Sequence, residues 1–218
     1  VVTTVDDAAQ ALARQALLTG RHANELIPDG TAILTHCFAD RALLYLLLEA
    51  RRIGKKLEVY SSETRPYLQG ARLTTASVLE VGYPVTLITD GMGGFLFRSG
   101  VVNALVTAAD RVCLDGTICN KVGTYQFALA AKANGCPYFV LRQSGPDRES
   151  ATEADVQIEY RDPASVLTFE GRSLTPHGVR GLYPAFDITP PELVTAIVTE
   201  AGVIEPPYGK SIARAMAA

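Results

Sequence analysis

The chain has 218 residues, which is enough for one domain with a sizeable core, and its 48% hydrophobic and 20% charged residues are typical of a globular protein. A formal net charge of −3 gives no electrostatic reason to expect nucleic acid or an anionic membrane as a partner. No apolar run approaches the ~20 residues that cross a bilayer, and the first ten residues lack the order of a signal peptide. We therefore expect a cytoplasmic protein with no nucleic-acid or membrane partner.

Helical and extended patterns alternate along most of the chain. In order, the sequence predicts a helix at 6–19, a strand at 31–36, a helix at 40–53 with Asp40 as its N-cap, a strand at 57–61, a helix at 70–81, strands at 84–89 and 103–108, a helix at 125–133 and a strand at 137–141. Short, nearly uninterrupted apolar strands separated by helices favour a parallel sheet covered on both faces. We therefore expect one Rossmann-like α/β domain over residues 1–218, with N-terminal helices in 1–28.

The last third of the chain is less regular. Residues 143–184 are rich in charge, Gly and Pro, and predict an irregular excursion with one or two edge strands. Residues 191–201 (PELVTAIVTEA) predict a final helix, with Thr189 as its N-cap. Beyond Pro206 and Pro207 we expect a mobile tail, residues 206–218.

Polar residues gather where the predicted strands end. Cys37, Asp90 and Asp110 each follow a strand, and the strand at 57–61 runs into Glu63. In parallel sheets, ligands bind beyond the carboxyl ends of the strands. The sequence therefore predicts a site at this edge of the sheet.

Each of these residues also has a purely structural interpretation. Cys37 can be a buried small hydrophobe, and His36 should point to the other side of the strand, away from Cys37. Asp110 can cap a helix or pair with Arg111, and Asp90 can cap the next helix or face the pocket. The glycines that follow Asp90 (GMGG) do not form a nucleotide-binding fingerprint.

Two segments suit an anionic ligand. In ETRPYLQGARLT (63–74), Arg65 and Arg72 can bind phosphate and Gln69 sugar hydroxyls, although an ion-paired loop is the alternative. In NKVGTY (120–125), Asn120 and Lys121 are expected to open a helix, where backbone N–H groups favour an anion. Asn120 can instead be a simple N-cap.

The four cysteines (Cys37, Cys113, Cys119 and Cys136) match no common zinc spacing, and a domain of this size needs no disulfides. We expect free thiols, no metal and no organic cofactor. His22 and His177 show no partner pattern and are expected at the surface.

Five segments together resemble the methylthioribose-1-phosphate isomerase family. They are THC (35–37), ETRPYLQGARLT (63–74), TLITDGM (86–92), ADR…DG…NKVGTY (109–125) and PAFDITPPELVTAIVTEAGVI (184–204). The wider superfamily includes archaeal ribose-1,5-bisphosphate isomerases and the regulatory subunits of the initiation factor 2B complex. The family's N-terminal helical region, with its Arg-Gly phosphate-binding loop, has no counterpart here. Phe38-Ala39-Asp40 and Ala108 also depart from the family pattern.

The resemblance implies a Rossmann-like fold and interconversion of an aldose 1-phosphate and a ketose 1-phosphate. The first expectation is conversion of 5-methylthioribose 1-phosphate to 5-methylthioribulose 1-phosphate in methionine salvage, by a homodimer without metal or cofactor. It implies Cys37 and Asp110 as catalytic residues, and Gln69, Asn120 and Lys121 as substrate contacts. Arg65 is a further expected substrate contact because its guanidinium group can bind phosphate. The alternatives are a non-catalytic initiation factor 2B-like regulatory or binding module, and an isomerase of another phosphorylated ribose such as ribose 1,5-bisphosphate.

Overall fold

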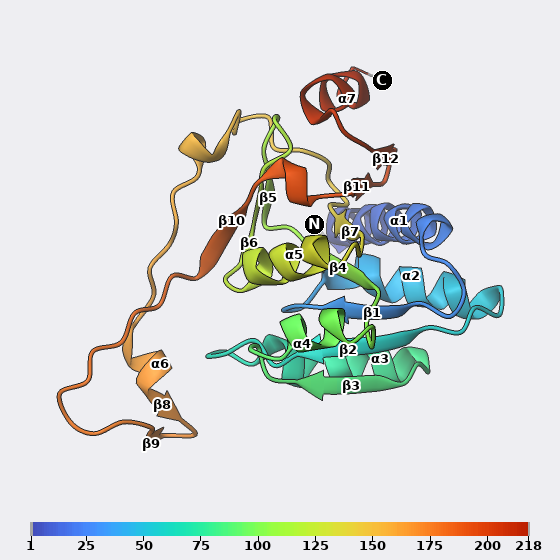
Figure 1. The fold of residues 1–218 in the computed structure, drawn as a ribbon. Coiled ribbons are helices and arrows are strands. Elements are labelled where there is room, and N and C mark those ends of the chain that lie inside the picture. The colour runs from blue at the N-terminus through green and yellow to red at the C-terminus, as the bar shows by residue number, and fades with distance from the viewer. Residues whose placement is uncertain (1, 218) are drawn as a thin grey trace.

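A seven-stranded sheet forms the centre of the computed structural model, which describes residues 2–217 and the side chains of residues 7–217 (Figure 1). Neighbouring strands run parallel, except that β12 is antiparallel to β11. The predicted Rossmann-like α/β fold is thereby confirmed. In the spatial order of the sheet, the strands are β12 (Gly202–Ile204), β11 (Ala196–Thr199), β7 (Tyr138–Leu141), β4 (Ala104–Ala108), β1 (Ala32–Thr35), β2 (Glu58–Ser62) and β3 (Val85–Ile88).

Helices cover both faces of this sheet. Each strand alternates between two apolar clusters: Ile33 and Val106 face one, Leu34 and Leu105 the other. In the middle of the sheet both faces are buried, so β4, β7 and β11 are nearly continuous apolar runs in the sequence. The first face carries α1 (Val2–Leu26), α2 (Asp40–Arg52) and α3 (Thr75–Val81), and the second carries α4 (Gly93–Arg98), α5 (Thr124–Ala133) and α7 (Tyr208–Ala215).

The strand order reverses between β1 and β4. From β1 the chain proceeds to β2 and β3 on one side, and from β4 to β7 and β11 on the other. In doubly wound sheets, the crevice at such a reversal is where ligands bind, beyond the carboxyl ends of the strands. Cys37 follows β1 and Asp110 follows β4, so both lie at this crevice.

A second, antiparallel sheet in the order β10-β6-β5 corrects one prediction. Asn120 and Lys121 lie in a strand of this sheet and do not open a helix; α5 begins at Thr124, after Gly123 as its N-cap. The expectation of Asn120 as an N-cap is therefore wrong. Asp40 is not an N-cap either, because it is the first residue of α2 and follows Ala39 at the cap position. The strands of this sheet are β5 (Arg111–Val112), β6 (Ile118–Lys121) and β10 (Phe186–Thr189).

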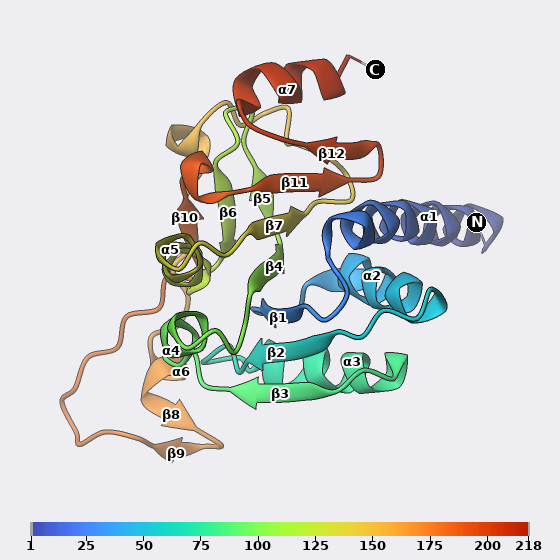
Figure 2. The ribbon, with the colours of Figure 1, turned by 45° about the vertical axis from the view of Figure 1, so that its right-hand side comes forward.

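Residues 143–184, here called the arm, extend away from the sheet and return to it (Figure 2). The arm is irregular, as predicted, but its two strands pair only with each other and do not extend the central sheet. The prediction that strands of this segment lie at the edge of the main sheet was therefore wrong: they form a separate two-stranded sheet. The regular elements of the arm are η2 (Glu153–Asp155), α6 (Ala164–Leu167), β8 (Thr168–Phe169) and β9 (Arg172–Ser173).

The C-terminal part contradicts two predictions. Residues 191–201 do not form a helix: a single 3₁₀ turn, η3 (Pro191–Leu193), is followed by β11, which is fully buried and pairs with β7. Ile197 and Val198 face opposite apolar clusters, as in the other central strands. Residues 208–215 form α7 with Ile212 buried, so the expectation of a tail there is also wrong.

Two negative findings hold for the described residues. Within residues 2–217, no helix combines the length and the apolar character needed to cross a membrane. No group of three or more His, Cys, Asp or Glu side chains in the same range is arranged to hold a metal ion. All four cysteines are free thiols, as predicted.

Candidate active site

Cys37 sits in a strained turn directly after β1. Its φ of 62° is in the left-handed region, which a residue with a side chain occupies at a cost of about 1–3 kcal/mol. Two threonines hold the turn: the Cys37 N–H donates to Thr64 Oγ1 at 3.0 Å, and the Thr74 hydroxyl donates to the Cys37 carbonyl at 2.6 Å. The thiol is half-buried, and burial raises its pKa. The raised pKa keeps the thiol of this turn neutral near pH 7.

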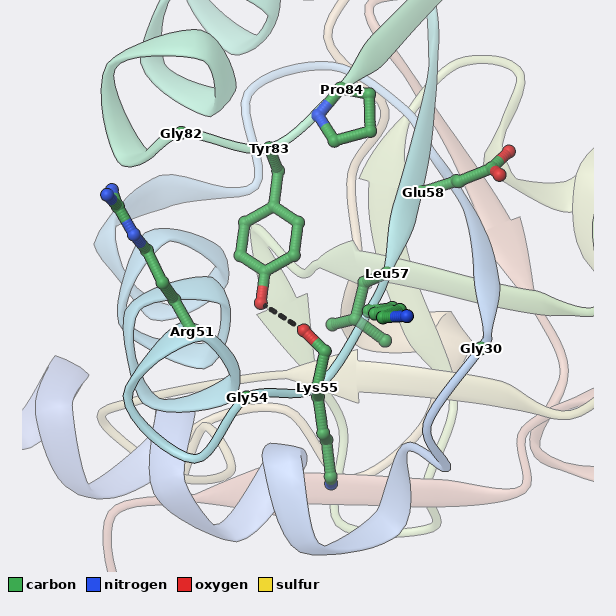
Figure 3. A pocket seen from close by; sticks show the side chains of 10 residues that line it. Gly30, Arg51, Gly54, Lys55, Leu57, Glu58, Gly82, Tyr83 and Pro84 are labelled. Atoms are coloured by element: carbon green, nitrogen blue, oxygen red, sulfur yellow. Dashed lines mark hydrogen bonds between the residues drawn. The ribbon is translucent and has the colours of Figure 1, made fainter.

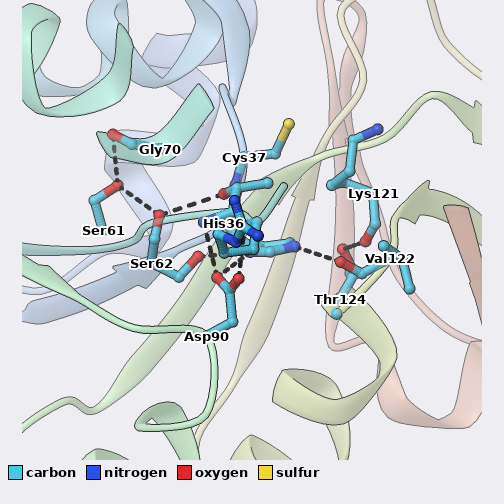
Figure 4. A network of polar contacts seen from close by, with 12 residues as sticks. His36, Cys37, Ser61, Ser62, Gly70, Asp90, Lys121, Val122 and Thr124 are labelled. Atoms are coloured by element: carbon cyan, nitrogen blue, oxygen red, sulfur yellow. Dashed lines mark hydrogen bonds and ion pairs between the residues drawn. The ribbon is translucent and has the colours of Figure 1, made fainter. Parts of the chain in front are cut away.

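His36 points away from Cys37, as predicted, into a buried polar network (Figure 4). Its Nε2 lies 2.8 Å from the Val122 carbonyl oxygen and its Nδ1 lies 2.5 Å from Ser62 Oγ. Burial lowers the pKa of the imidazole, which therefore stays neutral near pH 7.

Asp90 ties the end of β3 to the turn that follows β2. Its two carboxylate oxygens accept hydrogen bonds from the N–H groups of Thr64 and Arg65, at 2.8 and 2.7 Å. The carboxylate does not cap α4, whose N-cap is Met92 with no side-chain hydrogen bond. Since Thr64 also binds the Cys37 N–H, Asp90 supports the Cys37 turn indirectly.

Asp110 and Lys121 complete the group around Cys37. Asp110 is exposed to solvent, yet partial burial of its carboxyl group raises its pKa, and the Lys121 charge opposes that rise. Lys121 is 4% exposed; its Nζ donates to the Ala185 carbonyl at 3.1 Å and lies 4.5 Å from the centre of the Phe186 ring. Burial lowers the pKa of Lys121, while the nearby Cys37 and Asp110 raise it. The three side chains therefore act on one another electrostatically.

The predicted structural roles of Asp110 are not observed. It precedes β5 and no helix, and the Arg111 guanidinium donates to Ser150 Oγ at 2.7 Å. Asn120 is buried, and its amide donates to Thr124 Oγ1 at 3.0 Å. In β6, Asn120 pairs with Asp187, whose carboxylate accepts from the N–H of Gly123 at 2.6 Å.

The segment 63–74 faces the arm. Arg65 Nη2 donates to the carbonyls of Val166 and Thr168, at 3.4 and 3.2 Å, and the guanidinium stacks 5.3 Å from the Phe169 ring centre. Gln69 precedes the π-helical turn η1 (Gly70–Thr74), and its Oε1 is buried without a hydrogen-bond partner among the described residues. Arg65, Gln69 and Arg72 all line a cavity of about 660 Å³ between this segment and the arm.

The site also contains two residues of the arm that the sequence analysis did not predict, Arg161 and Tyr183. Arg161 binds Glu159 with two hydrogen bonds of 2.9 and 3.0 Å. Its positive charge opposes the rise that burial causes in the pKa of both Cys37 and Asp110. Tyr183 is 3% exposed and packs edge-on against Tyr67, with ring centres 5.6 Å apart. Nothing in the irregular, charge-rich arm sequence distinguishes these two residues from their neighbours.

A separate cavity of about 510 Å³ lies near the amino-terminal ends of β2 and β3 (Figure 3). Two of its three basic side chains are already bonded to backbone carbonyls: Arg51 Nη1 to Val81 at 2.6 Å, and Lys55 Nζ to Ile27 at 2.7 Å. The Tyr83 hydroxyl donates to the Lys55 carbonyl at 2.9 Å. None of the predicted site residues lines this cavity.

Comparison with known proteins gives consistent results. The model of the initiation factor 2 subunit family matches residues 1–206. The methylthioribose-1-phosphate isomerase of Desulforudis audaxviator is 41% identical over 220 residues, which cover 95% of this chain and 63% of that protein. The chain thus spans less than two thirds of that relative.

Two solved structures share the fold. The 5-methylthioribose 1-phosphate isomerase of Pyrococcus horikoshii superposes with a TM-score of 0.88 and 34% identity, covering 94% of this chain and 59% of that one. The delta subunit of translation initiation factor eIF-2B from A. fulgidus gives a TM-score of 0.92 and 34% identity, covering 100% of this chain and 66% of that one.

Proposed function

The chain belongs to the initiation factor 2 subunit family, and we propose that it is an aldose–ketose isomerase acting on 5-methylthioribose 1-phosphate. One observation carries the proposal. A half-buried thiol, Cys37, and a carboxyl group of raised pKa, Asp110, meet beside the buried cation Lys121 at the reversal of strand order. A protein that only offered a binding surface would not need this combination. The name of the Desulforudis audaxviator relative supports the choice of sugar.

The chemistry of a sugar 1-phosphate explains the need for an acid. The phosphate on the anomeric oxygen prevents ordinary ring opening, because that oxygen has no proton to lose. A protonated carboxyl group can instead give its proton to the ring oxygen, so that the bond from C1 to that oxygen breaks and leaves a cation at C1 stabilised by the phosphate-bearing oxygen. The raised pKa of Asp110 keeps this carboxyl group protonated closer to neutral pH. We assign this role to Asp110.

After ring opening, hydrogen moves with its electron pair from C2 to the cationic C1, and the C2 hydroxyl returns a proton to the Asp110 carboxylate as it becomes the ketone. Cys37 is assigned to this step because its neutral thiol supplies a partly dry surface, which disfavours exchange with solvent. Lys121 suits the substrate's negative charge, and Gln69, whose Oε1 lacks a partner among the described residues, suits a sugar hydroxyl. Asn120 is assigned to the substrate on the resemblance alone, and Arg65 is assigned to it because a guanidinium group can bind phosphate.

The test is turnover. The protein is incubated separately with 5-methylthioribose 1-phosphate and ribose 1,5-bisphosphate, and ketose formation is followed by NMR. We expect turnover of the first sugar and its loss in Cys37→Ser and Asp110→Asn. Cys136→Ser, which changes a half-buried thiol away from the site, is the matched control. If the folded protein converts neither sugar, the enzyme proposal is wrong; if Cys37→Ser keeps full activity, the role of Cys37 is wrong.

A second candidate is a non-catalytic regulatory or binding module. It is favoured by the fit to the eIF-2B delta subunit from A. fulgidus, which covers the whole of this chain. Absence of turnover together with retained binding of a sugar phosphate, measured by calorimetry, would support it.

Three further expectations belong to the same proposal. We expect a homodimer, which light scattering coupled to size-exclusion chromatography measures directly. We expect the chain to unfold as one domain, with a single cooperative transition. A cytoplasmic location, expected from the free thiols, is tested by cell fractionation.

A further inference from the structure

The imidazole of His36 connects three segments that come from different strands. It belongs to the end of the β1 segment next to Cys37, it bonds Ser62 at the end of β2, and it bonds Val122 directly after β6. The side chains of both His36 and Ser62 are almost fully buried, at 1% and 0% exposed. Cys37 and Lys121 are the chain neighbours of His36 and Val122.

The directions of these hydrogen bonds determine where the ring proton lies. A carbonyl oxygen can only accept, so the Nε2 that lies 2.8 Å from Val122 must carry the proton. In a neutral ring Nδ1 is then an acceptor, and the Ser62 hydroxyl donates to it.

The ring has little freedom to rotate out of this arrangement. Phe127 of α5 packs edge-on against it, with ring centres 5.2 Å apart. Gly123 lies on the Nε2 side, where a Cβ atom would approach Nε2 to 2.9 Å. Gly123 also has a φ of 108°, so glycine is required there both by the backbone and by the imidazole.

We propose that His36, neutral and protonated on Nε2, is a positioning residue that holds the turn carrying Cys37 at a fixed separation from the strand end carrying Lys121. It acts through the Val122 carbonyl and Ser62 and does not touch the substrate. The inference rests on the proposed function only for the identity of the substrate.

The separation has a measurable consequence. The Lys121 charge lowers the pKa of the Cys37 thiol, against the rise that burial causes. If the bond from His36 to Val122 is lost, Lys121 keeps its contacts with β10, but the strand end that carries it is no longer tied to the turn that carries Cys37. The thiol should then ionise at higher pH, whether or not the protein turns over a sugar.

Two substitutions separate the two bonds of the ring. In His36→Gln, the longer side chain can place an amide N–H near the Nε2 position and keep the bond to Val122. In His36→Asn, the shorter amide reaches only the Nδ1 position, so it keeps Ser62 and leaves the Val122 carbonyl without its donor. His22→Gln is the matched control, because His22 bonds the Thr199 carbonyl at 3.0 Å, outside the site.

The experiment measures alkylation of Cys37 by iodoacetamide across a pH series, with the modified peptide quantified by mass spectrometry. We expect His36→Asn to shift the profile to higher pH, and His36→Gln and His22→Gln to follow the parent. With substrate, kcat of His36→Asn should fall about 10- to 100-fold with KM nearly unchanged, since a misplacement of about 1 Å costs up to about 100-fold. His36→Gln should stay within about threefold of the parent.

Several results would overturn the inference. Identical alkylation profiles for the parent and His36→Asn would do so, as would equal losses in His36→Asn and His36→Gln. If His36→Asn does not fold, the position of the ring proton in the parent carries the test. Ring ¹⁵N chemical shifts of the parent must show the proton on Nε2; a proton on Nδ1 would refute the inference without any variant. Turnover by the parent separately decides the proposed function.

Discussion

Gly70 is the position where one added methyl group should damage the site most. A Cβ there would lie 1.8 Å from the Ser62 carbonyl oxygen and 2.9 Å from Thr64 Oγ1. To regain even 3.0 Å, the π-helical turn must retreat from β2 by about 1.2 Å. The Ser62 carbonyl cannot move away easily, because it belongs to the backbone of β2, which is paired in the central sheet with a strand on each side. Gly70→Ala also strains the hydrogen bond of 3.3 Å from Ser61 Oγ to the Gly70 carbonyl.

The close contact at Gly70 predicts how much Gly70→Ala should lower both the unfolding free energy and the turnover. Overpacking of a tight site costs typically 1–3 kcal/mol, and the rigid backbone places Gly70→Ala at about 3 kcal/mol of unfolding free energy. The retreat moves Gln69, which directly precedes Gly70, and a displacement of about 1 Å can reduce turnover about 100-fold.

Urea unfolding followed by circular dichroism measures the stability, and ketose formation measures the turnover. Gly94→Ala is the matched control, because Gly94 lies in α4 with open space around its Cβ position. Alanine there should stabilise the helix by about 0.5–1 kcal/mol. Parent-like stability and turnover of Gly70→Ala would refute the reasoning.

Two further predictions concern charge. Burial raises the pKa of Asp187 to about 6, so between pH 4 and 6 the folded state keeps a proton that the unfolded chain, with a pKa near 3.9, has released. As the pH rises from 4 to 6, the parent should therefore lose up to about 3 kcal/mol of unfolding free energy. Asp187→Asn should remove this loss. Equal pH slopes of the unfolding free energy of parent and variant, measured by urea unfolding, would contradict the prediction. Because Arg161 lowers the pKa of Cys37, Arg161→Gln should shift Cys37 alkylation to higher pH, whereas Arg172→Gln on the exposed β8–β9 hairpin should not; a profile unchanged in Arg161→Gln would be the contrary result.

The central sheet could be predicted from the sequence because its order follows from local patterns. Strands that are buried on both faces are apolar runs with β-branched residues, and the helices between them are longer and bounded by glycine, such as Gly54 and Gly82. The rule that ligands bind at carboxyl ends then brought Cys37 and Asp110 to one edge. This much needs no knowledge of distant contacts.

The errors arose where distant contacts decide the local structure. Residues 191–201 have prolines and a glutamate where a helix would begin, but pairing with β7 makes Ala196–Thr199 a strand. Lys121 precedes a helix in the sequence, but it lies in a strand because β6 pairs with the distant β10. Arg161 and Tyr183 lie in an irregular segment whose sequence has no hydrophobic periodicity. They come near Cys37 only because the arm folds back toward the sheet, which the sequence does not predict.

The pairing of β6 with β10 also fixes when the site can form during synthesis. Lys121 lies opposite Phe186, and its ammonium group bonds the carbonyl of Ala185. At about 5–20 residues per second, the ribosome needs about 3–13 s to extend the chain from Lys121 to Phe186. Throughout that interval Cys37 and Asp110 are already synthesised while β6 still lacks its β10 partner. The crevice is therefore completed late in translation, after β1, β2, β3 and β4 have all emerged.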